Sequence, residues 1–209
     1  MKKTDVIESL NVSRETINSF GEYEALLSKW NEKINLVSKN TLADLWVRHF
    51  LDSGQIINHV DASGKKWVDI GAGAGFPGLV VALLLRDKKI DCDIILVEKN
   101  TKKAFFLNEV IRKLNLNVKV FNNNVDTIEP LNADILTARA FSELKKLIEL
   151  SVRHRKERGV SLFLKGENYR LELDKTLNYR FFDYDIFDSV SNSSGKIIRV
   201  KKIFNDKGN

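Results

Sequence analysis

The sequence predicts an α/β fold with a doubly wound, mostly parallel sheet, and two patterns in the chain support this prediction. From Trp67 onward, short apolar runs typical of strands alternate with longer segments typical of helices. Two further strand-like runs, about 180–187 and 196–203, flank the polar loop 191–195. Because such a loop joins neighbouring strands, we expect a C-terminal antiparallel hairpin in the sheet.

The first 60 residues have helical periodicity and are expected to form an N-terminal helical extension. Ser13 can cap a helix, and Thr41 can cap a second one after a turn-like stretch at 31–40. The apolar side of the first helix includes Ile17, Phe20, Leu27 and Trp30, and that of the second includes Leu42, Leu45, Trp46 and Phe50. Because no Pro- or Ser-rich linker follows, we expect residues 1–60 to pack on a main domain at 61–209.

The main domain is expected to alternate strands and helices up to the hairpin. Strands are predicted at 67–70, 93–98, 118–121, 133–138 and 160–165, and helices at 77–86, 102–115, 142–156 and 168–177.

Composition limits the kind of protein. The chain has 209 residues, of which 43% are hydrophobic and 30% charged, as in ordinary globular proteins. No apolar run is long enough to span a bilayer, and the N-terminus lacks an apolar signal core, so we expect a cytoplasmic protein. The single Cys92 has no partner for a disulfide or metal site. A net charge of +6 is compatible with an anionic partner such as RNA.

The segment 67–78 contains the main functional signal. A short strand breaks into a helix through four glycines within eight residues, at 71, 73, 75 and 78. Such a turn exposes backbone N–H groups and lets a ligand approach the main chain. It therefore predicts a site for a nucleotide or a nucleoside-like cofactor.

Two cofactors compete for this turn. Gly73-x-Gly75-x-x-Gly78 satisfies the dinucleotide fingerprint, which predicts an NAD(P)-dependent oxidoreductase. The frame Asp69-x-Gly71-x-Gly73-x-Gly75 instead places an acid before the first glycine, as in S-adenosylmethionine-dependent methyltransferases. A carboxylate there suits an ammonium and a sulfonium and repels a pyrophosphate. We favour the second frame, and the terminal hairpin also suits the Rossmann-like methyltransferase fold.

Ligands of such sheets bind at the carboxyl ends of the strands, so residues that follow other strands are further candidates. Glu98 is expected to accept hydrogen bonds from a ribose, or else to be a charge at a helix N-terminus. Val125 and Asp126 can contact the edge of an adenine. Arg139 can bind a cofactor carboxylate, an RNA phosphate or a structural acid.

The chain lacks the residues that several methylation reactions require. It has no Pro-Pro pair of the kind common in methylases of exocyclic base amines, and Cys92 lies away from the predicted ligand edge. An acceptor that is already nucleophilic, such as guanine N7, needs no general base. We identify no discrete catalytic residue.

Five ordered motifs together resemble one family. They are 69–78 with its Phe-Pro-Gly ending, 29–38, 48–53, 139–141 and 164–166. These segments are similar to the bacterial ribosomal RNA small subunit methyltransferase G family, also called glucose-inhibited division protein B. The resemblance implies S-adenosylmethionine-dependent methylation of guanine N7 in small-subunit (16S) ribosomal RNA near the decoding region. The implied partner is this RNA or an assembled subunit, and we expect a monomer without a metal site.

The resemblance also implies roles for individual residues. Gly71 and Phe76 would contact the cofactor in the glycine turn, Val125 and Asp126 would lie beside the adenine, and Arg139 would be a further contact. The turn itself predicts that Gly73 also binds the cofactor.

Arg48, His49 and Lys165 are candidates for binding the RNA substrate. The alternatives are an ion pair between Arg48 and Asp52, four residues apart on a helix, and an edge position for Lys165 with its charge in solvent. A non-catalytic RNA-binding module remains a rival to both enzyme classes.

Overall fold

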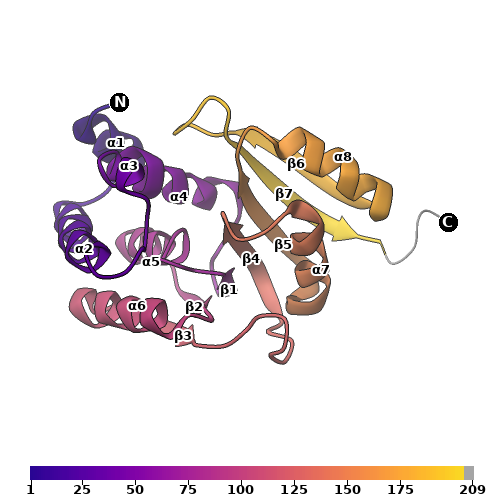
Figure 1. Cartoon of the computed structure of the whole chain (residues 1–209), viewed down its shortest axis with the longest axis horizontal. Helices are drawn as coiled ribbons and strands as arrows, with labels where there is room; N and C mark the ends of the chain where they lie inside the picture. The colour runs from indigo at the N-terminus through magenta and orange to yellow at the C-terminus, as the bar shows by residue number, and fades with distance from the viewer. Residues whose placement is uncertain (205–209) are drawn as a thin grey trace.

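A seven-stranded sheet forms the centre of the protein, in the order β3-β2-β1-β4-β5-β7-β6 (Figure 1). This computed structural model describes residues 1–204, and residues 205–209 of the predicted main domain lie outside the described residues. The strands are β1 (Lys65–Ile70), β2 (Cys92–Val97), β3 (Val118–Phe121), β4 (Ala133–Arg139), β5 (Arg155–Lys165), β6 (Phe182–Asp188) and β7 (Lys196–Ile203). The first five pair in parallel, and β7 runs antiparallel to β5 and β6. The predicted sheet and its C-terminal hairpin are confirmed.

Helices cover both faces of the sheet. They are α5 (Gly78–Asp87), α6 (Thr101–Leu114), α7 (Leu144–His154) and α8 (Tyr169–Tyr179). One buried cluster joins α5 and α6 to the sheet, and a second joins α7 and α8 to its other face. The alternation of side chains along β1 assigns Trp67 to the first cluster and Val68 to the second.

One predicted boundary was wrong. The helix expected at 142–156 ends at His154, and β5 begins at Arg155 instead of 160. The first part of β5 is strongly basic and polar, and its pairing with β4 contains a register shift. A charged, irregular strand start has no apolar alternation by which the sequence would reveal it.

The N-terminal region is helical, but its second half is less regular than predicted. Its elements are α1 (Lys3–Leu10), α2 (Arg14–Asn31), α3 (Lys39–Leu42), the π-helical segment η1 (Trp46–Leu51), α4 (Asp52–Gly54) and the 3₁₀ segment η2 (Gln55–His59). Ser13 caps α2 as predicted, by accepting from the Thr16 N–H. The predicted cap at Thr41 was wrong, because Ser38 accepts from the Thr41 N–H and the helix begins earlier.

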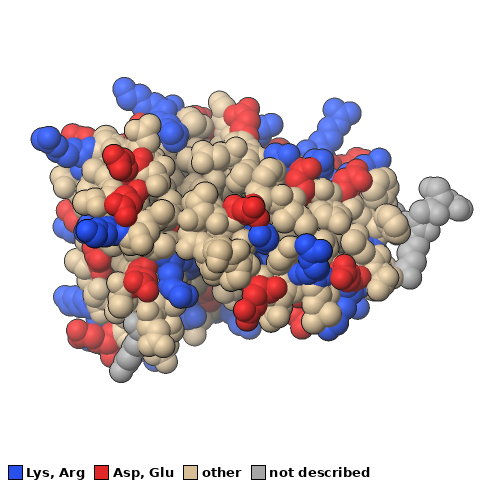
Figure 2. Space-filling model, turned by 90° about the horizontal axis from the view of Figure 1, so that it is seen from above, with Lys and Arg blue, Asp and Glu red and all other residues tan. Residues whose placement is uncertain are grey.

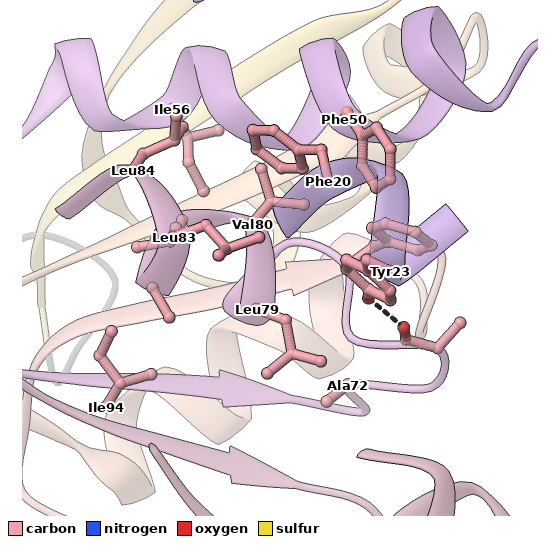
Figure 3. Close-up of a cluster of buried hydrophobic side chains, with 14 of the residues drawn as sticks. Phe20, Tyr23, Phe50, Ile56, Ala72, Leu79, Val80, Leu83, Leu84 and Ile94 are labelled. Atoms are coloured by element: carbon pink, nitrogen blue, oxygen red, sulfur yellow. Dashed lines mark hydrogen bonds between the residues drawn. The ribbon is translucent and has the colours of Figure 1, made fainter. Parts of the chain in front are cut away.

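The N-terminal helices share one hydrophobic cluster with α5. Phe20, Tyr23, Phe50, Leu79 and Val80 all have fully buried side chains in it (Figure 3). The hydroxyl of Tyr23 also donates a hydrogen bond to the carbonyl of Ala74 in the glycine turn. The N-terminal helices therefore support the glycine turn from behind. A division of the chain at residue 60 stays a prediction.

The surface carries charges of both signs. On the face drawn in Figure 2, basic and acidic side chains are interspersed over much of the area. Within residues 1–204, the helices are all too short or too polar to cross a membrane.

Asp69 lies entirely inside the protein, between β1 and the start of α5. Its carboxylate accepts from the Gly78 N–H at 2.9 Å and from the Thr137 hydroxyl at 2.9 Å. Thr137 is the residue of β4 paired with Asp69, and its oxygen accepts from the indole N–H of Trp67 at 3.0 Å. Burial raises the pKa of Asp69 to about 7, against the lowering effect of these hydrogen bonds and of Arg139.

Replacing Asp69 by Asn should change how stability depends on pH. The raised pKa means that the folded protein holds a proton that the unfolded chain releases between about pH 4 and about pH 7, so the contribution of this group falls as pH rises through that window. Asn cannot ionise. In urea unfolding, the free energy of unfolding of Asp69→Asn relative to wild type should therefore rise by up to about 1.4 kcal/mol per pH unit.

Asp183→Asn, at an exposed position of β6, controls for the loss of one carboxylate. If the difference in the free energy of unfolding between Asp69→Asn and wild type stays constant from pH 4 to 7, the pKa of Asp69 is not raised.

Candidate active site

A cavity of about 450 Å³ lies where the carboxyl ends of β1 to β4 meet. The strand order reverses between β1 and β4, so this is the topological switch point at which ligands of open α/β sheets bind. The cavity brings together seven residues predicted to bind a cofactor and one predicted to bind substrate. These are Gly71, Gly73, Phe76, Glu98, Val125, Asp126, Arg139 and His49.

The four glycines of the turn have different surroundings. Gly71 and Gly73 line the cavity, with φ angles of +66° and +57°. A Cβ on Gly73 would meet only the Gly71 carbonyl oxygen, at 3.7 Å, so this position opens toward the cavity. A Cβ on Gly75 would collide with Tyr23 and Leu79. Gly78 is similarly enclosed by Leu96 and the Asp69 carboxylate, so Gly75 and Gly78 serve packing.

The start of α5 offers little to a pyrophosphate. The Gly78 N–H donates to the Asp69 carboxylate, and the Leu79 N–H donates to the Gly75 carbonyl at 2.8 Å. Pro77, which precedes them, has no N–H to offer. The helix terminus is therefore already occupied by a carboxylate, and the dinucleotide frame Gly73-x-Gly75-x-x-Gly78 is not favoured.

The same geometry corrects the reason for preferring the other frame. Asp69 was expected to face an ammonium and a sulfonium, but its side chain is fully buried and does not line the cavity. The alternation along β1 directs it to the α5 face, on the same side as Trp67. Asp69 thus holds the turn in shape from behind.

Glu98 follows β2 and is nearly buried at the cavity wall. One carboxylate oxygen accepts from the Gly73 N–H at 2.9 Å, and the other from the Asn100 N–H at 2.7 Å. Asn100 in turn caps α6. Each oxygen keeps a lone pair for a further donor. Contact with a ribose remains a prediction, and Glu98 also fixes the turn.

Val125 and Asp126 follow β3 at another wall. The carbonyl of Val125 lies 2.7 Å from Nε2 of the buried His154, which holds this peptide in place. The Asp126 carboxylate pairs with the Lys146 ammonium at 2.6 Å and is partly exposed. The predicted adenine contact is compatible with this position and stays a prediction.

Arg139, at the end of β4, forms the best-connected polar group of the site. Its guanidinium donates to the Arg48 carbonyl at 2.8 Å, to the Asp52 carboxylate at 3.3 Å and to His49 Nδ1 at 2.5 Å. It also lies 4.9 Å from the centre of the Phe76 ring. The ion pair between Arg48 and Asp52, considered as the alternative to a substrate role, is not formed, because Asp52 contacts Arg139. Arg48 instead lies 3.9 Å from Asp44, with a mostly exposed side chain.

A second cavity, of about 760 Å³, continues from the first and is called the outer groove below. The two cavities share Thr41, His49, Arg139 and Ala140 in their walls. The outer groove is also lined by the substrate candidates Arg48 and Lys165. The Lys165 side chain is only 10% exposed, and its ammonium contacts the Glu172 carboxylate at 2.6 Å, so an internal partner already neutralises it.

The sequence alone did not identify the segment between α2 and α3 as part of the site. The first cavity, called the cofactor cavity below, is lined by Leu36, Val37 and Ser38 of this segment and by Thr41 of α3. Asn31 holds this segment, because its side-chain oxygen accepts from the N–H groups of Leu36 and Val37. Further residues not foreseen in the wall are Lys99, Lys103, Asn123 and Phe141. The motif at 29–38 was the one available signal.

The sheet order, the hairpin and the cavity at the switch point define the class of S-adenosylmethionine-dependent methyltransferase folds. A solved structure of a putative methyltransferase of this kind from Methanococcus maripaludis matches with a TM-score of 0.57, at 15% identity, over 88% of this chain and 93% of the other. At that identity the match shows the fold alone.

The sequence comparisons are more specific. Residues 16–198 match the family described as rRNA small subunit methyltransferase G. Proteins named ribosomal RNA small subunit methyltransferase G are 38% identical in Ruegeria pomeroyi, over 92% of this chain and 94% of the relative, and 37% identical in Ruegeria sp. strain TM1040, over 93% and 94%. The chain belongs to this family, and the resemblance seen in its motifs is confirmed.

Gly73→Val should abolish binding of S-adenosylmethionine, because the new side chain enters the open space beside the glycine turn. The positive φ adds a backbone cost of about 1–2 kcal/mol that has nothing to do with the ligand. Gly64→Val is a matched control, since Gly64 has a φ of +64° and no described atom within 4 Å of its Cβ position. Calorimetric titration with the cofactor measures affinity, and thermal unfolding measures stability.

The two variants should lose similar stability, and only Gly73→Val should lose affinity. Wild-type affinity in Gly73→Val would remove the glycine turn from the cofactor site.

Proposed function

We propose that this protein methylates guanine N7 in small-subunit (16S) ribosomal RNA, near the decoding region, with S-adenosylmethionine as methyl donor. The observation that carries the proposal is the junction of two cavities at His49 and Arg139 in a member of this family. One cavity has the glycine turn and the acid after β2 that suit a nucleoside-like cofactor. The other is an open, polar groove of a size that suits a nucleotide.

The residues that line the cofactor cavity fit S-adenosylmethionine. The Gly73 backbone allows close approach, and Gly71 lines the same cavity beside it. Glu98 has lone pairs for ribose hydroxyls, and Val125 and Asp126 lie where an adenine edge would bind. Arg139 provides the cation for a carboxylate. When bound, S-adenosylmethionine supplies an electrophilic methyl group on a sulfonium.

The chemistry at the junction suits an acceptor with no proton to lose. Arg139 is a permanent cation, and His49 has its Nδ1 bound to Arg139. Burial, together with Arg139 and Arg48, lowers the pKa of His49 to about 3. Neither residue is therefore suited to accept a proton from a nucleophile. Guanine N7 carries a free lone pair, so positioning is the main requirement, which can contribute about 7–11 kcal/mol.

Arg48 and Lys165 are proposed to contact the RNA from the outer groove. The Arg48 side chain is 58% exposed, and its nearest carboxylate is 3.9 Å away, so it is available to a phosphate. Lys165 would share its charge between Glu172 and the RNA. An enzyme acting on ribosomal RNA works in the cytoplasm of a bacterium, and we expect a monomer.

Methyl transfer tests the proposal directly. Purified protein is incubated with methyl-labelled S-adenosylmethionine and small subunits from cells lacking this enzyme, and the RNA is then digested to nucleosides. We expect label in 7-methylguanosine with wild type and with Gly64→Val, and none with Gly73→Val. Naked 16S RNA in a parallel reaction identifies the form of the substrate.

Label in another nucleoside would overturn the acceptor while keeping the cofactor. RNA binding without transfer, unaffected by the cofactor, would favour the non-catalytic RNA-binding module.

A further inference from the structure

His49, which lines both cavities, carries a buried hydrogen-bond donor that has no partner in the described part of the chain. The His49 side chain is 7% exposed and lines both cavities. The guanidinium of Arg139 has only donors, so His49 Nδ1 must accept its hydrogen bond. The proton of the neutral ring is then on Nε2. This Nε2 is buried and has no hydrogen-bond partner among residues 1–204.

The orientation of this donor is fixed. The His49 ring stacks on Phe76, with ring centres 4.7 Å apart and planes at 22°. Arg139 is itself held by the Arg48 carbonyl and the Asp52 carboxylate. Rotating the ring or exchanging its tautomer would break the bond to Arg139, because an N–H would then face a guanidinium. The His49 nitrogen that is not bound to Arg139 is therefore a donor and not an acceptor.

Leaving a buried donor unsatisfied is unfavourable, so a ligand that supplies an acceptor at this point recovers that cost. Guanine presents two acceptors side by side on one edge, N7 and O6, whereas adenine has an amino donor in place of O6. In a guanine whose N7 faces the cofactor cavity, O6 lies beside N7 on the same edge of the base and is the acceptor available to His49.

We propose that His49 is the residue that distinguishes guanine from other purines, by donating a hydrogen bond from Nε2 to O6 of the target base. This inference rests on the proposed function, because it requires that N7 of a guanine is the methyl acceptor. The hydrogen bond holds the base with its nucleophilic nitrogen toward the cofactor cavity. Adenine at the same position would meet an N–H with its own amino group, and both donors would be left unpaired.

Two variants separate this role from support of Arg139. His49→Asn can accept from Arg139 with its side-chain oxygen near the position of Nδ1, but it is too short to replace the Nε2 donor. His49→Gln reaches the Nε2 position with its amide, which can present either a donor or an acceptor by turning over. Asn therefore preserves the support of Arg139, and Gln preserves contact with the base without its fixed polarity.

The experiment uses the full chain and small subunits reconstituted with one altered base at the mapped target nucleotide. The four bases are guanine, hypoxanthine, 2-aminopurine and adenine. Hypoxanthine keeps O6, whereas 2-aminopurine lacks O6 and keeps N7. Methyl transfer gives kcat/KM for each substrate, and calorimetry gives the affinity for S-adenosylmethionine.

For wild type, we expect guanine and hypoxanthine to be preferred over 2-aminopurine by about 10-fold to about 100-fold, the equivalent of one lost hydrogen bond to a buried donor. In His49→Asn this preference should fall to within about threefold, with cofactor affinity near that of wild type. His49→Gln should retain activity on guanine and gain activity on adenine.

Three results would overturn the inference. The first is a preference for bases with O6 that persists in His49→Asn. The second is a wild type that does not prefer guanine over 2-aminopurine. The third is a loss of cofactor affinity in His49→Asn, which would assign the donor to the cofactor carboxylate. Each of these leaves methyl transfer to guanine by wild type intact. Failure of wild type to methylate guanine subunits would instead overturn the proposed function, and the inference with it.

Discussion

The buried carboxylate of Asp69 at the start of α5 is the interaction on which the site depends. By accepting from the Gly78 N–H and the Thr137 hydroxyl, it ties the glycine turn to β4 and fixes where the helix begins. The same bond fills the helix terminus that a pyrophosphate would use, and the open position of the turn is Gly73. A single buried acid thus determines the shape of the turn and the class of cofactor that the turn accepts.

The N-terminal region lines the candidate site as well as supporting it. Tyr23 packs behind the glycine turn and bonds to the Ala74 carbonyl. His49 and Asp52 contact Arg139, and the segment after α2 supplies a further wall of the cofactor cavity. Much of the apolar area buried by α5 is covered by these helices, so removing them would expose the core and dismantle the junction of the two cavities together.

The sequence predicted what depends on local patterns and missed what depends on long-range pairing. The sequence predicted the alternating strands and helices, the hairpin and the glycine turn, because periodicity and turn residues depend only on nearby positions in the chain. The contact between Arg139 and His49 joins residues 90 positions apart and has no local signature. The alternative pair between Arg48 and Asp52 assumed regular α-helical geometry, but Trp46–Leu51 is π-helical. Arg48 lies beside Asp44 instead, and Asp52 accepts from the distant Arg139.

Arg139 lines both cavities and connects them. A guanidinium can donate to the Arg48 carbonyl, Asp52 and His49 at once while its flat face lies against Phe76, and the compact ammonium of lysine cannot reproduce this geometry. The Asp52 carboxylate that holds Arg139 also accepts from the Ser191 hydroxyl at 2.6 Å, in the loop between β6 and β7 that borders the outer groove. The Asp52 carboxylate thereby connects the wall of the outer groove to the Arg139 guanidinium at the end of the cofactor cavity.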